Sequence, residues 1–126
     1  MNDYIKSLQD QDKLNISIDQ SKIFNWKFTK IAGPCSVEGP DIIDIAIKLK
    51  SLGVNALRAG AYKPCTYPVL KENRGWKEGL RDEGLNLLSE AKKASGLPIV
   101  TEVMDASMID KVGQVADVFQ VGARNF

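Results

Sequence analysis

Five side chains that can bind anions or metals, or move protons, follow one another along the sequence where apolar segments end. They are Cys35, Arg58, Lys63, Glu102 and Arg124. The carboxyl ends of parallel strands form the edge of a sheet at which ligands bind. If the apolar segments are such strands, Arg58, Lys63 and Arg124 converge into a cationic cluster. Arginine holds phosphate and carboxylate groups with two parallel hydrogen bonds, so this cluster suits a small, multiply charged anion.

Each of these residues also has a purely structural interpretation. A cysteine at a strand end is more often a small buried apolar residue than a ligand, and residue type alone gives the ligand about one chance in five. Arg58 and Glu102 are equally well explained as an ion pair between neighbouring strands. The shared placement of the polar residues, rather than any one of them, therefore favours a binding site.

The elements that must position these residues alternate from Phe28 onward. Apolar segments without polar alternation predict strands at 28–32, 54–61, 98–103 and 118–123, as in strands that are buried on both faces. Between them, apolar residues recur at helical spacing and predict three helices. Their apolar stripes are Ile42, Ile45, Ala46, Leu49 and Leu52, then Leu85, Leu88 and Ala91, then Met108, Ile109, Val112, Val115 and Ala116. The alternation predicts an α/β fold with four parallel strands.

Capping residues and loops set the limits of these helices. Gly53 and Gly96 stand where the first and second helices should end in a left-handed residue, and Asp82 and Asp105 are expected to cap the second and third. The segment 63–81 holds two prolines, two glycines and five basic residues. A long loop of this kind inside a compact domain is usually functional. Residues 1–27 lack strong periodicity and are interpreted as an N-terminal extension.

Composition narrows the class of protein. The 126 residues carry a formal net charge of +1, with 44% apolar and 26% charged residues, which is ordinary for a soluble domain. No apolar run approaches the ~20 residues of a membrane span, and no secretory leader is recognisable. The near-neutral charge argues against nucleic-acid binding. The chain has no histidine and two cysteines, so imidazole chemistry is excluded and a reducing, cytoplasmic location is expected.

Four sequence motifs, taken together and in their order along the chain, resemble those of a known family. They are IAGPCSVE at 31–38, LRAGAYKP at 57–64, VTEV at 100–103 and QVGARN at 120–125. Together they resemble the type I 3-deoxy-D-arabino-heptulosonate 7-phosphate (DAHP) synthases over about residues 28–126. The 3-deoxy-D-manno-octulosonate 8-phosphate synthases share the fold and part of the pattern, but their Asn-Arg-Ser pattern is missing here.

The resemblance implies an enzyme with a (β/α)8 barrel. It condenses phosphoenolpyruvate with erythrose 4-phosphate and releases phosphate, which is the first step of the shikimate pathway to aromatic amino acids. By resemblance, Cys35 is a ligand of a divalent metal, and a thiolate ligand favours Mn, Fe, Co or Zn over Mg. Arg58 and Lys63 bind phosphoenolpyruvate, Glu102 places the water or the intermediate, and Arg124 holds the phosphate of phosphoenolpyruvate.

One departure from the family pattern concerns the second substrate. Family members usually read Lys-Pro-Arg-Thr, in which the Arg and Thr meet the phosphate of the aldose. This chain has Cys65 before Thr66, and a neutral thiol cannot hold a phosphate as a guanidinium does. Thr66 keeps its expected role and Arg74 is a candidate to compensate for Cys65. The identity of the aldose phosphate therefore stays open.

The length of the chain sets a further expectation. A (β/α)8 barrel needs eight strands and about 250 residues, whereas this sequence predicts four strands. We expect residues 28–126 to be the N-terminal half of a barrel, with the remaining metal ligands beyond position 126 and no activity of this chain alone. Open sheet edges predict a homo-oligomer. The alternative from another class is a non-catalytic half-barrel module that binds a phosphorylated metabolite.

Overall fold

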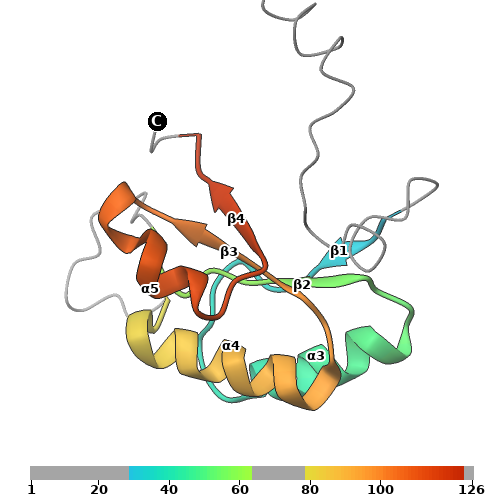
Figure 1. Ribbon diagram of the computed structural model, residues 1–126. Coiled ribbons are helices and arrows are strands. Elements are labelled where there is room, and N and C mark those ends of the chain that lie inside the picture. The colour runs from blue at the N-terminus through green and yellow to red at the C-terminus, as the bar shows by residue number, and fades with distance from the viewer. Residues whose placement is uncertain (1–28, 64–78, 124–126) are drawn as a thin grey trace, which may run out of the picture.

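The computed structural model describes residues 29–63 and 79–123, in which strands and helices alternate (Figure 1). In chain order the elements are β1 (Ile31–Ala32), α3 (Asp41–Ser51), β2 (Ala56–Arg58), α4 (Arg81–Ser95), β3 (Ile99–Val103), the 3₁₀ helix η1 (Ala106–Met108), α5 (Ile109–Gly113) and β4 (Val118–Val121). The predicted α/β alternation is therefore confirmed. None of the helices in these described ranges is long and apolar enough to cross a membrane.

The strands form one parallel sheet in the order β1-β2-β3-β4. Each strand lies beside the next one in sequence, and the order never reverses. A doubly wound open sheet contains such a reversal, whereas consecutive neighbours are the arrangement of a (β/α)8 barrel. Helices α3 and α4 lie side by side against one face of the sheet (Figure 1).

The hydrophobic core lies between this face and the helices. Leu57 and Ile99 of the strands are fully buried against Ile42 of α3 and Leu88 of α4. The strand register places Leu57 beside Ile99, so both side chains point to the helical layer. Arg58, the next residue, therefore points to the opposite face of the sheet. The core thus fixes which strand residues face the helices and which face the candidate site.

The predicted C-terminal ends of the helices agree with the structure better than the predicted N-terminal caps. Gly53 and Gly96 have φ angles of 78° and 72° and follow the ends of α3 and α4, as predicted. Asp105 caps η1 by accepting from the Ser107 backbone N–H at 2.8 Å. Asp82, however, does not cap α4. The helix begins at Arg81 after Leu80, with no side-chain cap, and Asp82 bonds to other elements.

Two residues of the predicted apolar helix stripes are not buried. Leu52 is 62% exposed and Ile109 is 44% exposed, although the apolar stripes predict that both are buried. Leu52 follows the last residue of α3, so the chain has already left the helical path there. Ile109 opens the short α5, after the 3₁₀ turn η1, and the change of helix type rotates it away from the core. The strands are also shorter than predicted. Strand β4 is not buried on both faces as predicted, because Phe119 and Val121 are 40% and 57% exposed.

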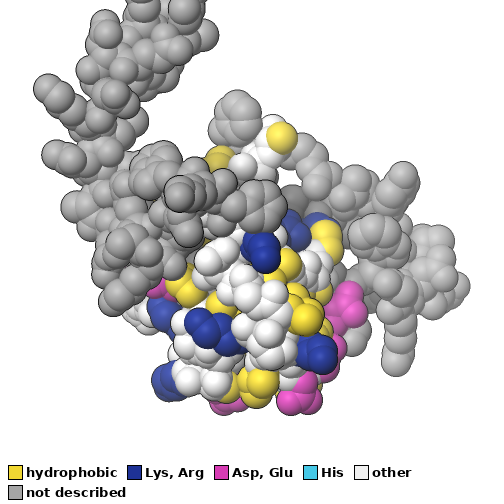
Figure 2. Space-filling model, turned by 90° about the vertical axis from the view of Figure 1, so that its right-hand side faces the viewer, with side chains coloured by type: hydrophobic (Ala, Val, Ile, Leu, Met, Phe, Trp, Pro, Cys, Tyr) yellow, Lys and Arg dark blue, Asp and Glu magenta, His cyan; other side chains and the backbone are white. Residues whose placement is uncertain are grey.

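Charged side chains of both signs are spread over the end of the molecule that carries α3 and β1. Figure 2 shows Lys and Arg side chains between apolar ones on this face, with Asp and Glu near its margins. Interspersed charge of this kind is typical of a solvated surface. The mixture of positive and negative side chains among the described residues of this face agrees with the near-neutral net charge of the sequence.

Candidate functional site

Backbone contacts bring the segment after β1 alongside the segment after β2. Ser36 forms an isolated parallel bridge with Gly60. The Val37 N–H donates to the Gly60 carbonyl at 2.8 Å, and the Gly60 N–H donates to the Cys35 carbonyl at 3.2 Å. Cys35 is therefore held beside the residues that follow Arg58.

Gly33 makes this close approach possible. Its φ is 153°, and a Cβ added there would lie 2.0 Å from the Arg58 carbonyl oxygen. No other residue type fits both this backbone conformation and this separation. The glycine of the GPCS motif is thus needed to lay the Cys35 segment across the end of β2.

Cys35 and Lys63 meet at this edge. The Lys63 Nζ donates to the Cys35 Sγ, and the Arg58 Nη1 donates to the Cys35 carbonyl oxygen at 3.4 Å. The Lys63 hydrogen bond is the main reason that the pKa of the Cys35 thiol is lowered. Burial opposes it as the second-largest effect, and Arg58 lowers the pKa further. The thiol is exposed. This arrangement favours the thiolate, which is the form that binds metals and attacks electrophiles.

Arg58 is oriented by a residue that the sequence motifs do not assign to the site. Its Nε donates to the Gln120 Oε1 at 2.9 Å, so the guanidinium reaches over β3 to β4. The register pairs Gln120 with Glu102 and Arg58 with Val100, which puts all four on the face away from the helices. A polar residue between the apolar Phe119 and Val121 was the signal that could have identified Gln120.

Glu102 lies on the same face as Arg58 and is 6% exposed. The Arg58 Nε donates to Gln120, and the ion pair between Arg58 and Glu102 that a structural interpretation predicts stays a prediction. Glu102 therefore contributes a buried carboxyl group to the sheet face that carries Arg58.

The backbone between Arg58 and Lys63 is fixed on both sides. The Ala61 N–H donates to the Oγ1 of Thr101 at 3.3 Å, and the Ala61 carbonyl accepts from the Arg81 N–H at 2.8 Å. Thr101 is 1% exposed and stands in the VTEV motif beside Glu102. The two residues of this motif thus face opposite sides, Thr101 toward the backbone of the loop and Glu102 toward the site.

The structure brings together Cys35, Arg58 and Lys63, and it places Glu102 on the same sheet face as Arg58. Thr66 and Arg124, together with Cys65 and Arg74, lie outside the described residues. The phosphate contacts that are predicted for Thr66, Arg74 and Arg124 therefore stay predictions.

The described residues do not form a metal site by themselves. No group of three His, Cys, Asp or Glu side chains gathers in residues 29–63 and 79–123, and the sequence contains no histidine. Cys35 is a single donor, and its sulfur accepts from a lysine ammonium. A metal bound at Cys35 would need its other ligands from elsewhere.

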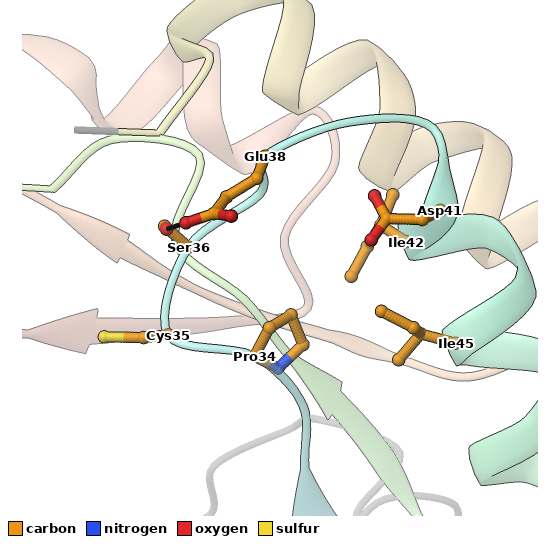
Figure 3. A pocket seen from close by; sticks show the side chains of 7 residues that line it. All are labelled: Pro34, Cys35, Ser36, Glu38, Asp41, Ile42 and Ile45. Carbon is orange, nitrogen blue, oxygen red and sulfur yellow. Dashed lines mark hydrogen bonds between the residues drawn. The ribbon is translucent and has the colours of Figure 1, made fainter. Parts of the chain in front are cut away.

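A pocket of about 170 Å³ lies between the β1–α3 segment and α3. Its lining residues are Pro34, Cys35, Ser36, Glu38, Asp41, Ile42 and Ile45. Figure 3 shows the Cys35 side chain pointing away from Ile42 and Ile45, while Ser36 donates to Glu38 at 3.3 Å. The Cys35 sulfur thus turns away from this pocket, toward Lys63. At this edge the cations that contact Cys35 are Arg58 and Lys63, and neither lines this pocket.

A parallel α/β sheet with arginine, lysine and a thiol of lowered pKa gathered at its carboxyl edge is typical of barrel-type proteins whose ligands are small anions. The sequence matches the DAHP synthetase I family over residues 13–126, and the chain belongs to this family. The match begins within the segment 1–27 that its weak periodicity assigns to an extension.

Two curated relatives illustrate the range of the similarity. The phospho-2-dehydro-3-deoxyheptonate aldolase of Thermotoga maritima is 44% identical over 111 residues, which are 87% of this chain and 31% of the relative. The 2-dehydro-3-deoxyphosphooctonate aldolase of Leptothrix cholodnii is 35% identical over 114 residues, 86% of this chain and 37% of the relative. The chain thus spans about a third of the length of these relatives.

Solved structures show the same similarity in three dimensions. The crystal structure of the DAHP synthase from Thermotoga maritima superposes with a TM-score of 0.66 at 45% identity, covering 78% of this chain and 27% of that chain. A truncated form of the synthase from the same organism gives a TM-score of 0.62 at 43% identity, covering 78% of this chain and 32% of that chain. The predicted fold class, the first strands and helices of a (β/α)8 barrel, is therefore confirmed.

Proposed function

We propose that this chain carries the phosphoenolpyruvate-binding part of a DAHP synthase, an enzyme that condenses phosphoenolpyruvate with erythrose 4-phosphate in the shikimate pathway. The observation that carries the proposal is the convergence of Arg58 and Lys63 on Cys35 at the carboxyl edge of the sheet. Family membership supports the same reaction.

Arg58 is prepared to bind an anion. A guanidinium has five N–H donors, and in the described part of the chain Arg58 uses one for Gln120 and one for the Cys35 carbonyl. Because both bonds fix the plane of the guanidinium, its other donors are aimed before the ligand arrives. Preorganised donors of this kind favour binding of a carboxylate or phosphate without further ordering. Lys63 adds a second positive charge beside them.

The other residues act later in the proposed reaction. The enol carbon of phosphoenolpyruvate attacks the aldehyde of the aldose phosphate, and water then adds where positive charge develops. Glu102, buried on the site face, is proposed to place that water or the intermediate. Arg124 is proposed to hold the phosphate that leaves, and Thr66 to bind the phosphate of the aldose.

A divalent metal ion (Mn, Fe, Co or Zn) is the cofactor that the family resemblance implies, and Cys35 is proposed as one of its ligands. The lowered pKa of the thiol suits this role, because a metal binds the thiolate. The chemistry that a bound divalent ion supplies is polarisation of the aldehyde, which makes its carbon more electrophilic. Cys35 would provide one donor to that ion.

Two aldose phosphates are candidates for the acceptor. The number of carbon atoms in the product distinguishes them. Phosphoenolpyruvate contributes three carbons, so a heptonate requires a four-carbon aldose phosphate and an octonate a five-carbon one. Relatives with both kinds of product name match this chain. We favour the four-carbon erythrose 4-phosphate because the heptonate relative is the more similar of these two.

The proposed setting is cytoplasmic, with self-association of the chain. Phe119 and Val121 of β4 are 40% and 57% exposed. Apolar side chains at an edge strand favour pairing with another copy.

Calorimetric titration of the purified chain with phosphoenolpyruvate, with and without Mn²⁺, tests the proposal. Binding that is lost in Arg58→Met supports the proposed site, and binding that Arg58→Met leaves unchanged would contradict it. Binding that Mn²⁺ strengthens supports the synthase over the metal-independent module, because Cys35 then acts as a metal ligand. A titration without any binding signal would contradict both.

A further inference from the structure

The residue before Lys63 is tied to two helices by an interaction that the proposed reaction does not use. The Tyr62 hydroxyl donates to the Oδ1 of Asp82, at the start of α4. The same Asp82 oxygen lies 2.6 Å from the Nζ of Lys111 in α5. We call Tyr62, Asp82 and Lys111 the Tyr62 clamp. It joins the segment after β2 to both helices.

The directions of the pKa shifts suit a tie that is present at neutral pH, although the Asp82 and Lys111 side chains are exposed. Lys111 and, to a lesser degree, Tyr62 lower the pKa of the Asp82 carboxyl, and Asp82 raises the pKa of Lys111. Burial and the neighbouring carboxylate raise the pKa of Tyr62. At neutral pH the phenol thus keeps its proton and donates, while Asp82 accepts from both partners as a carboxylate.

The clamp is the tie nearest to Lys63 on its N-terminal side. The Ala61 backbone is bonded at its N–H and at its carbonyl, and the Tyr62 ring packs against the hydrophobic core. Ala61 and Tyr62 lie in a bend after β2. From this bend Tyr62 points to Asp82 and α5, whereas Lys63 points to Cys35. Holding the Ala61 backbone and the Tyr62 side chain therefore restricts the backbone from which Lys63 extends.

We propose that Tyr62, Asp82 and Lys111 are positioning residues that aim Lys63 at phosphoenolpyruvate. This inference rests on the proposed function of Lys63. The clamp touches no reacting atom, and it acts by removing rotational freedom from the backbone that carries the ammonium. A charge that is held in place before the ligand arrives binds it more tightly than a freely moving one.

Two measurements on the full chain test the clamp. In Tyr62→Phe, which keeps the ring in the core, we expect a lower ¹⁵N order parameter at the Lys63 amide. We also expect about threefold to tenfold weaker phosphoenolpyruvate binding, as ordering is lost. Asp82→Asn should act like Tyr62→Phe, and Lys111→Arg should keep the wild-type values. Asp105→Asn, an exposed Asp that caps η1, is the matched control and should leave both measurements unchanged.

A double-mutant cycle separates positioning from general stability. In a Lys63→Met background, Tyr62→Phe should no longer weaken phosphoenolpyruvate binding, because the residue that it positions is gone. An equal loss of affinity in both backgrounds, or a Lys63 amide that stays as ordered in Tyr62→Phe as in the wild type, would overturn the proposal. If the wild-type chain bound no phosphoenolpyruvate, the proposed function would fail. The relaxation measurement would still decide whether the clamp orders Lys63.

Discussion

Cys35 gains its chemical character from two cations that come from another part of the chain. Lys63 follows β2 and Arg58 ends it, and both bond to Cys35, one at the sulfur and one at the carbonyl. An exposed thiol without such partners is mostly protonated at neutral pH. The lowered pKa of Cys35 is therefore a property of the folded site and not of the residue.

This environment makes the reactivity of Cys35 depend on Lys63. A lower pKa leaves more thiolate at neutral pH, so the midpoint of alkylation rate against pH should lie below that of an ordinary thiol. Removing the principal cause of the shift in Lys63→Met should raise the midpoint and slow alkylation at pH 7 severalfold. Iodoacetamide labelling of the metal-free Cys65→Ser chain, followed by peptide mass analysis, measures this rate.

The matched control is Lys30→Met, since Lys30 lies at the other end of the sheet, where its backbone N–H bonds to Asn55. It should label like the parent chain. A midpoint that is the same in Lys63→Met and in the parent would contradict the described contact between Lys63 and Cys35.

At the scale of elements, glycine decides how closely β1 and β2 approach at the site. Gly33→Ala would place a Cβ 2.0 Å from the Arg58 carbonyl oxygen at a φ of 153°. We expect it to cost about 1–3 kcal/mol of unfolding free energy from the backbone conformation, with the clash adding to this. Urea unfolding followed by circular dichroism measures the loss.

Gly53→Ala is the matched variant, because Gly53 also has a positive φ of 78° but meets no atom within 4 Å. Its loss should come from the backbone conformation alone and be smaller. Equal losses in the two variants would show that the close approach of Gly33 to Arg58 does not exist in solution.

The order of the elements was predictable because it depends on local patterns. Apolar spacing and the glycines after α3 and α4 indicated the correct order of strands and helices, and motif residues indicated Cys35, Arg58 and Lys63 as neighbours. Contacts between distant residues were not predictable. Gln120 orients Arg58 across β3, and no local pattern in Val118–Val121 names its partner.

Asp82 is a second residue whose partners could not be predicted from local sequence patterns. Its position before an apolar stripe is typical of a helix cap, yet its carboxylate bonds to Tyr62 and Lys111. Tertiary partners with a hydroxyl and an ammonium outcompete the backbone N–H groups of α4 for this carboxylate. Such competition is settled only when α4, α5 and the β2 loop are placed together.

At the scale of the whole molecule, the amino edge and the carboxyl edge of the sheet carry different kinds of contact. At the amino edge, Asp117 accepts from the Ile99 N–H at 2.8 Å and pairs with Lys92 at 2.7 Å. Here the charges fix strand register and are mutually satisfied. At the carboxyl edge, Arg58 and Lys63 gather around Cys35. The amino edge thus carries stabilising contacts, and the carboxyl edge carries the residues that we propose bind the ligand.

The amino edge nevertheless offers the competing location for an anion. A hollow of about 280 Å³ lies there, and Lys50 and Asn55 are among its lining residues. If charge and space alone decided where phosphoenolpyruvate binds, this hollow would compete with the carboxyl edge. We expect the orientation of Arg58 by Gln120 to decide instead.

Mapping phosphoenolpyruvate onto the chain by two-dimensional ¹H–¹⁵N NMR tests this central claim most directly. We predict shift changes that are concentrated at Cys35, Arg58, Lys63 and Gln120, and that are lost in Arg58→Met. Shift changes centred on Lys50 and the amino edge, or unchanged in Arg58→Met, would contradict it.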